Sequence, residues 1–119
     1  EIMHVGDRVP LAASGRPMAE AISRISEKGF GCVAVTAADG RLAGIITDGD
    51  LRRHIGDGLL SRTVDEVMTR SPKTVDPDAL AATALQLVNA SAITSLMVVE
   101  DGRPVGIVHL HDLLRIGVA

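Results

Sequence analysis

The chain has 119 residues, the size of one compact unit, which leaves no room for a second large domain. Hydrophobic residues make up 46% of it and charged residues 23%, so it can bury a core without staples. The 12 Lys and Arg against 15 Asp and Glu give a net charge of -3, and Phe30 is the only aromatic residue. General nucleic-acid binding needs a cationic surface and stacking rings. The composition therefore argues against it.

The single cysteine and the absence of long apolar runs favour a cytoplasmic location. Cys32 is the only cysteine, so no intrachain disulfide can form, which fits the reducing cytoplasm. No apolar run approaches the roughly 18 residues of a membrane span, and nothing resembles a signal peptide. We expect a cytoplasmic protein with no membrane partner. The chain opens on Glu1 rather than Met, and we expect it to be cut from a longer protein.

An internal repeat organises the chain. The segment 39–53, DGRLAGIITDGDLRR, aligns without gaps with 101–115, DGRPVGIVHLHDLLR, and the two are identical at 8 of 15 positions. Upstream, CVAVTA aligns with SLMVVE, and MAEAISRI with AATALQLV. The sequence therefore predicts two copies of one unit, a first repeat at 1–58 and a linker with the second repeat at 59–119.

Each copy has the same order of predicted elements. Apolar residues spaced by three and four predict a helix, two β-branched runs joined by Asp-Gly predict a hairpin, and a short helix follows. Asp76 as N-cap and Pro77 at the first helical position mark the start of the second long helix. The elements are helix 17–28, strands 32–36 and 42–46, helix 48–55, a helical turn within 63–68, helix 79–89, strands 96–99 and 105–108, and helix 110–116. We expect an α/β (α+β) fold in which two pseudo-symmetric helix-strand-strand-helix repeats pack as one module.

Thr47 and Asp50 stand where a predicted strand runs into a helix. One interpretation is a nucleotide site, because free N–H groups and a hydroxyl can hold a phosphate and a carboxylate can accept both hydroxyls of a ribose. The other is a capping box, with Thr47 as N-cap and an acid at the third helical position. In the second copy His109 replaces the threonine while Asp112 is kept. An acid kept without its capping partner favours the ligand interpretation.

The second copy also contains the string His109-Leu110-His111-Asp112. Imidazoles two residues apart on extended chain point to one side, as metal ligands do. No third ligand is evident, so we expect no metal site and favour histidines that line a cleft and contact an acidic ligand. Cys32 lies in an apolar strand and is interpreted as a small buried hydrophobe without a catalytic role.

The repeated order of helix, apolar hairpin, Gly-Ile-Ile/Val and Asp-Leu helix resembles a tandem pair of cystathionine β-synthase (CBS) domains. More narrowly, the strings ITDGDLRRH, LLSRTVDEVMT and HLHDLLRIGVA resemble the C-terminal region of bacterial arabinose 5-phosphate isomerases. CBS pairs are regulatory modules that bind adenosine-type ligands in clefts between their repeats. Members of this isomerase family carry a sugar-isomerase domain before the pair, and its catalytic residues match no position here.

The resemblance also implies binding residues. Thr47 and Asp50 match the family's Thr-x-x-Asp ligand motif, whereas the second repeat keeps only its aspartate and departs at the threonine. Ligand contacts are further implied for the segment between the copies, whose residue types equally suit a solvated linker. The candidate binding residues are Thr47, Asp50, Arg70, Ser71, Lys73, Thr74, Val75, His109, His111 and Asp112.

Three functions follow for comparison. The first, which the resemblance implies, is a ligand-sensing regulatory module of a sugar-phosphate isomerase in the Kdo branch of lipopolysaccharide synthesis, binding an adenosine nucleotide or a nucleotide-sugar such as CMP-Kdo. The second, an enzyme, is disfavoured because no triad, carboxylate pair or P-loop is present. The third is a structural dimerisation module without a ligand. We expect no tightly held cofactor, and a homodimer that accompanies the parent's isomerase domain.

Overall fold

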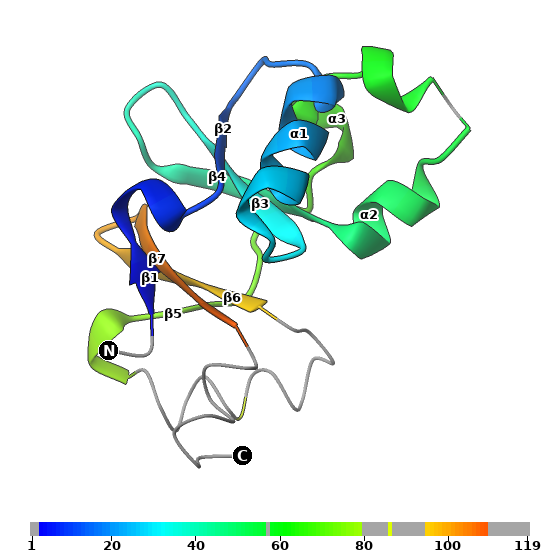
Figure 1. Cartoon of the computed structure of the whole chain (residues 1–119). Coiled ribbons are helices and arrows are strands. Elements are labelled where there is room, and N and C mark those ends of the chain that lie inside the picture. The colour runs from blue at the N-terminus through cyan, green and yellow to red at the C-terminus, as the bar shows by residue number, and fades with distance from the viewer. Residues whose placement is uncertain (1–2, 57, 80–85, 87–94, 110–119) are drawn as a thin grey trace. The chain divides into compact units, whose positions relative to one another are not determined.

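The computed structural model describes residues 3–56, 58–79, 86 and 95–109 (Figure 1). The chain divides into two compact units, one of residues 10–72 and one of residues 1–9 with 73–119. Within the described ranges, no helix has both the length and the apolar character needed to cross a membrane.

The unit of residues 10–72 places one long helix against a three-stranded sheet. The strand order is β2-β3-β4, with β2 parallel to β3 and β3 antiparallel to β4. Its elements in chain order are β2 (Leu11–Ala13), α1 (Met18–Lys28), β3 (Cys32–Thr36), β4 (Leu42–Thr47), α2 (Asp48–Arg53), the 3-10 helix η2 (Leu59–Ser61) and α3 (Val64–Val67).

Helix α1 confirms the predicted helix almost to the residue. Pro17 occupies the N-cap position, and Gly29 closes the helix with a positive φ of 79°, a conformation that glycine adopts at no steric cost. Met18, Ala21 and Ile25 are buried, at the spacing that had predicted the apolar face. The helix therefore forms because one side of it has a sheet to cover.

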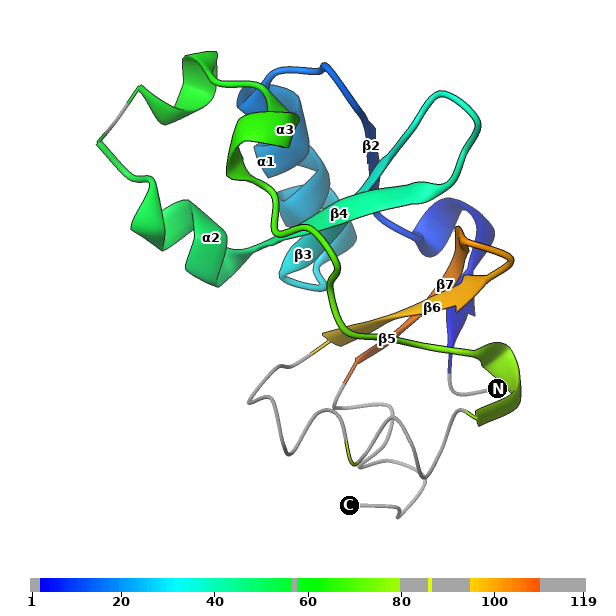
Figure 2. The same ribbon diagram turned by 180° about the vertical axis from the view of Figure 1, so that it is seen from behind.

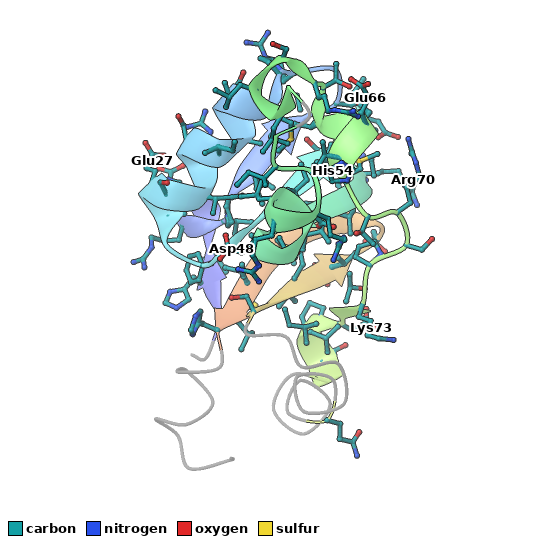
Figure 3. All side chains as sticks on the ribbon, turned by 90° about the vertical axis from the view of Figure 1, so that its right-hand side faces the viewer. Glu27, Asp48, His54, Glu66, Arg70 and Lys73 are labelled. Atoms are coloured by element: carbon teal, nitrogen blue, oxygen red, sulfur yellow. The ribbon has the colours of Figure 1, made fainter. Side chains whose placement is uncertain are left out.

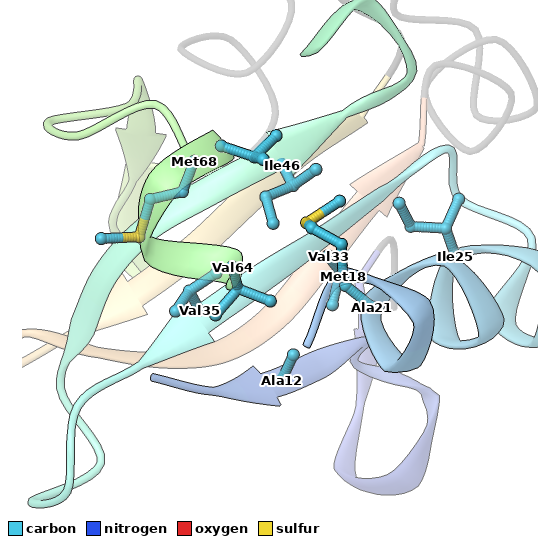
Figure 4. Packing of buried hydrophobic residues seen from close by; sticks show 10 residues of the cluster. Ala12, Met18, Ala21, Ile25, Val33, Val35, Ile46, Val64 and Met68 are labelled. Atoms are coloured by element: carbon cyan, nitrogen blue, oxygen red, sulfur yellow. The ribbon is translucent and has the colours of Figure 1, made fainter. Parts of the chain in front are cut away.

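The core of this unit lies between α1, α3 and the sheet (Figure 4). Val33 and Val35 of β3 and Ile46 of β4 are fully buried, and Val64 of α3 packs with them. The ten buried residues of the cluster are Ala12, Met18, Ala21, Ile25, Val33, Val35, Ile46, Val64, Val67 and Met68. The core therefore extends past residue 58, where the first repeat was predicted to end.

Helix α3 is tied to the turn before α1 by polar contacts, and Figure 2 shows the two helices side by side. Ser14 Oγ and the Gly15 N–H both donate to the Asp65 carboxylate, each at 2.6 Å. The Val64 N–H donates to the Arg16 carbonyl at 2.9 Å. These bonds hold a helix of 4 residues that is too short to be stable by itself.

The second unit contains a four-stranded sheet of order β1-β7-β6-β5. Strand β1 pairs antiparallel with β7, and β5 runs parallel to β6. Its described elements are β1 (His4–Val5), the 3-10 helix η1 (Gly6–Arg8), β5 (Thr74–Val75), the 3-10 helix η3 (Pro77–Ala79), β6 (Ser95–Glu100) and β7 (Arg103–His109). Most of predicted helix 79–89 and all of predicted helix 110–116 lie outside the described residues.

The two hairpins share an irregularity that marks them as copies. Both predicted hairpins are confirmed, and each has a register shift at the same place in its first strand, between Val35 and Thr36 and between Val98 and Val99. In the second hairpin the turn residues Asp101 and Gly102 both have positive φ, as the predicted Asp-Gly turn requires. The mixed α and β content and the repeated hairpin confirm the predicted fold class.

The strands β1, β2 and β5 were not predicted; β2 precedes α1, and β5 precedes the predicted helix 79–89. Because β1 pairs with β7, the first residues of the chain join the second unit. The compact units therefore have different boundaries from the predicted repeats, whose division at residue 58 stays a prediction about sequence copies.

Candidate functional site

Asp50 is the one charged residue among the described positions that is buried, with 3% of its surface exposed. It lies in the first turn of α2, and its neighbour across the helix start is Thr47. The Asp50 N–H donates to Thr47 Oγ1 at 3.3 Å, and the Thr47 N–H donates to Asp50 Oδ2 at 2.9 Å. These reciprocal bonds form a capping box and satisfy backbone donors that a helix start leaves open.

The second carboxylate oxygen of Asp50 has different partners. Arg53 Nη2 donates to Asp50 Oδ1 from one turn further along α2, and Thr69 Oγ1 donates to the same oxygen at 3.1 Å. Thr47 Oγ1 also donates to Oδ2 at 3.1 Å. A carboxylate has about four lone-pair positions, and four donors reach this one. The buried charge is thereby compensated within its own unit.

Thr69 reaches Asp50 because the chain leaving α3 runs along the edge of β4. Ile45 and Thr69 exchange both backbone hydrogen bonds, at 3.0 and 2.8 Å. A Cβ on Gly44 would lie 2.7 Å from Met68 Sδ and 2.8 Å from the Thr69 carbonyl oxygen, so only glycine permits this approach. The hydroxyl of Thr69 is held over the carboxylate by the sheet.

Thr47 and Asp50 were predicted from the sequence, whereas Arg53 and Thr69 were not. The spacing of Asp50 and Arg53, three residues apart on one helix, is a local signal that would have found the first of them. Thr69 is 19 residues from Asp50, and no local pattern links such distant positions.

The predicted ligand residues between the two copies fall in two settings. Arg70, Ser71 and Lys73 are exposed, and the side chains of Arg70 and Lys73 point away from the ribbon (Figure 3). Thr74 and Val75 form β5 beside β6, and the Val75 side chain is buried. The ligand role of these five residues stays a prediction.

The motif in the second copy is only partly described. His109 ends β7 and pairs in register with Ser95. His111 and Asp112 lie outside the described residues, so the proposed second half of the site stays a prediction. Among the positions that the structure does describe, no three His, Cys, Asp or Glu side chains gather as metal ligands would.

Cys32 lies on β3 with 3% of its surface exposed. Burial, and to a lesser extent the negative charge of Asp48, raises the pKa of the thiol to about 12. A thiol in that state is not a nucleophile, in keeping with the interpretation of Cys32 as a packing residue.

The CBS domain model matches the chain twice, at residues 2–57 and 64–119. The chain therefore belongs to the CBS domain family and is a tandem pair of such domains, as the repeated motifs had indicated. The resemblance drawn from the sequence is confirmed at this level.

Two curated relatives are close in sequence. The chain is 45% identical to the arabinose 5-phosphate isomerase KdsD of Pseudomonas aeruginosa and 38% identical to that of Yersinia pestis. In both cases the match covers 99% of this chain and 37% of the relative. The chain thus spans little more than a third of the length of these relatives.

A solved structure carries the same fold with ligands. The CBS domain pair of protein MJ0100, in complex with 5′-methylthioadenosine and S-adenosyl-L-methionine, superposes with a TM-score of 0.80 at 26% identity. The match covers 97% of this chain and 94% of that one. Both ligands contain an adenosine group.

Proposed function

We propose that this chain is a ligand-sensing regulatory module that binds a nucleotide through its ribose, with Asp50 accepting hydrogen bonds from the ribose hydroxyls. The observation that carries the proposal is a buried carboxylate beside Thr47, in the motif that the family resemblance associates with ligands. A carboxylate can accept charge-assisted hydrogen bonds from both hydroxyls of a cis-diol, and these are stronger than hydrogen bonds to a neutral amide, whereas an alkyl group accepts none.

Two candidate ligands, an adenosine nucleotide and a cytidine nucleotide-sugar, share the ribose diol that the proposal requires. The MJ0100 pair was solved with adenosine-type ligands, which favours an adenosine nucleotide. A cytidine nucleotide-sugar such as CMP-Kdo offers the same ribose diol, and the likeness to arabinose 5-phosphate isomerases makes an end product of sugar metabolism a reasonable signal. Arg70, Ser71 and Lys73 are the candidates for contact with the phosphate.

The proposed biological setting comes from the curated relatives. We infer that the module regulates an arabinose 5-phosphate isomerase and performs no chemistry itself, because the isomerases that it resembles are longer proteins of which it matches 37%. A homodimer of the chain stays a prediction. The exposed large side chains of Ile55 and Leu60, at 72% and 61%, are the apolar surface that it would use.

Calorimetry with AMP, S-adenosyl-L-methionine and CMP-Kdo tests the proposal, using Asp50→Ala and the matched control Asp48→Ala. We expect at least one of the three to bind the unchanged chain. Asp50→Ala should then lose about 1.5 to 3 kcal/mol of binding free energy, the range for hydrogen bonds to a charged group. Asp48 lies exposed on the same helix, so its variant should bind normally.

Asp50→Asn guards against a merely misfolded variant, because it keeps the side-chain shape while removing the charge. Unchanged affinity in both Asp50 variants, with circular dichroism showing an intact fold, would remove the ribose interpretation. If none of the three ligands raises the melting temperature of the unchanged chain, the structural dimerisation module takes its place.

A further inference from the structure

The carboxylate that the proposed function gives to the ligand already has hydrogen-bond partners within the chain. Asp50 receives four hydrogen bonds, from the Thr47 N–H, the Thr47 hydroxyl, the Arg53 guanidinium and the Thr69 hydroxyl. That number fills its lone pairs. A ribose diol therefore has to replace existing donors before it can bind.

The two carboxylate oxygens of Asp50 differ in how easily their hydrogen-bond donors can leave. Oδ2 belongs to the capping box that begins α2, so a ligand that took it over would disrupt the helix start. The donors on Oδ1 are side chains alone, and both residues are exposed. The Arg53 side chain is 66% exposed, against 4% for that of Asp50. A guanidinium released from this pair is rehydrated at once, as is a threonine hydroxyl.

We propose that Arg53 and Thr69 are exchangeable partners of Asp50 Oδ1 that compete with the hydroxyls of the ligand and so set the affinity of the site. This inference rests on the proposed function. The exchange conserves the hydrogen bonding of the buried carboxylate, because two donors from the chain leave and two hydroxyl donors arrive. The charge on Asp50 is compensated by the chain when the site is empty and is solvated by the diol when it is filled.

Substituting a competing residue changes the ligand affinity in the opposite direction from substituting a residue that contacts the ligand. A residue that contacts the ligand weakens binding when it is removed, whereas a competitor strengthens binding. Arg53→Met keeps the length of the side chain but has no donor, and Thr69→Val keeps the β-branched shape and the backbone bonds to Ile45.

The test measures the affinity of adenosine, which is uncharged and so has no phosphate for Arg53 to contact. We expect Arg53→Met and Thr69→Val each to bind adenosine about three- to tenfold more tightly than the unchanged chain, the factor that corresponds to one exchanged hydrogen bond. The gain should be smaller for 2′-deoxyadenosine, which keeps the 3′-hydroxyl but lacks the 2′-hydroxyl of the cis-diol. Thr69→Ser retains the hydroxyl and should bind as the unchanged chain does.

Matched controls lie close by. Arg52→Met makes the arginine-to-methionine change at the preceding residue of α2, and Thr36→Val makes the threonine-to-valine change on β3. Both should leave the affinity unchanged, and circular dichroism checks that every variant is folded. Equal or weaker adenosine binding by folded Arg53→Met and Thr69→Val overturns the competition while leaving the proposed function standing. Failure of the unchanged chain to bind any nucleoside or nucleotide overturns the proposed function, and the competition with it.

Discussion

Gly44 and Gly106 hold the same place in the two hairpins, and each faces a methionine. A Cβ on Gly106 would lie 2.8 Å from Met3 Sδ, and one on Gly44 would lie 2.7 Å from Met68 Sδ. The segment around Met68 thus packs against the second strand of the first hairpin, and the segment around Met3 packs against the second strand of the second hairpin. At both positions a side chain larger than hydrogen would clash. This shared contact explains a glycine that the sequence alignment shows in both copies.

Gly44→Ala should destabilise the chain by about 1 to 3 kcal/mol, the range for overpacking. The reason is that the Thr69 carbonyl, 2.8 Å from the new Cβ, is fixed by its bond from Ile45. Gly49→Ala is the control, since its Cβ would meet its nearest atoms at 3.6 Å. That change lies in α2 and should stabilise by about 0.5 to 1 kcal/mol. Urea unfolding measures both, and equal effects of one sign would contradict the steric argument.

The raised pKa of Cys32, about 12 against an ordinary 9.0, predicts a loss of stability in alkali. The unfolded chain ionises its thiol above pH 9 while the folded chain does not, so the free energy of unfolding should fall as pH rises from about 9 toward 12. The slope is about 1.4 kcal/mol per pH unit for this one group. Unfolding curves of the unchanged chain and Cys32→Ala at pH 8 to 11 measure it. Parallel pH profiles would show that Cys32 contributes nothing.

At the scale of elements, helix α3 depends on Asp65. Hydrogen bonds from Ser14 and Gly15 lower the pKa of this carboxyl below its ordinary 3.8. A lowered pKa means that stabilisation is present at neutral pH and is lost as pH falls through the native value. Asp65→Asn should therefore destabilise at pH 7 by about 0.5 to 1.5 kcal/mol, a modest figure because the pair is exposed.

A double-mutant cycle with Ser14→Ala checks this contact. If Ser14 and Asp65 stabilise the chain through each other, the double variant should lose less stability than the sum of the two single variants. The difference between Asp65→Asn and the unchanged chain should also shrink below pH 3.8. Strict additivity, or a difference that persists in acid, would show that the contact does not stabilise α3.

Elements with a strong local signal were predictable from sequence. Helix α1 has the 3.6-residue period along 11 residues, and both hairpins have β-branched runs and Asp-Gly turns. The capping-box interpretation of Thr47 and Asp50 is confirmed because both partners lie within one turn. Strands β1 and β5 have 2 residues each and β2 has 3. Such strands are defined by their long-range partners and have no period of their own.

At the scale of the whole molecule, sequence repeats and compact units are different divisions. The alignment of 39–53 with 101–115 fixes where the copies correspond, but not which neighbour supplies the rest of each core. The repeat pattern therefore could not assign the segments outside the predicted helix-strand-strand-helix elements to one core or the other. In the structure, residues 64–68 contribute to the core of the unit of residues 10–72, and β1 completes a sheet whose other strands begin at Thr74.

This difference predicts how fragments behave. A fragment of residues 10–72 contains every member of the buried cluster around α1, whereas a fragment of residues 1–58 lacks Val64, Val67 and Met68. Losing three buried side chains leaves cavities and uncovers one face of a small sheet, at several kcal/mol in total, which exceeds what a unit of about 60 residues can spare.

We therefore expect residues 10–72 to unfold cooperatively in urea and residues 1–58 to show little helix by circular dichroism and no sharp transition. Restoring residues 59–72 to the second fragment, as residues 1–72, should recover the transition, because α3 and the Ile45–Thr69 bonds return together. A sharp, equally stable transition for residues 1–58 would mean that the sequence repeat, and not the compact unit, is the unit of folding.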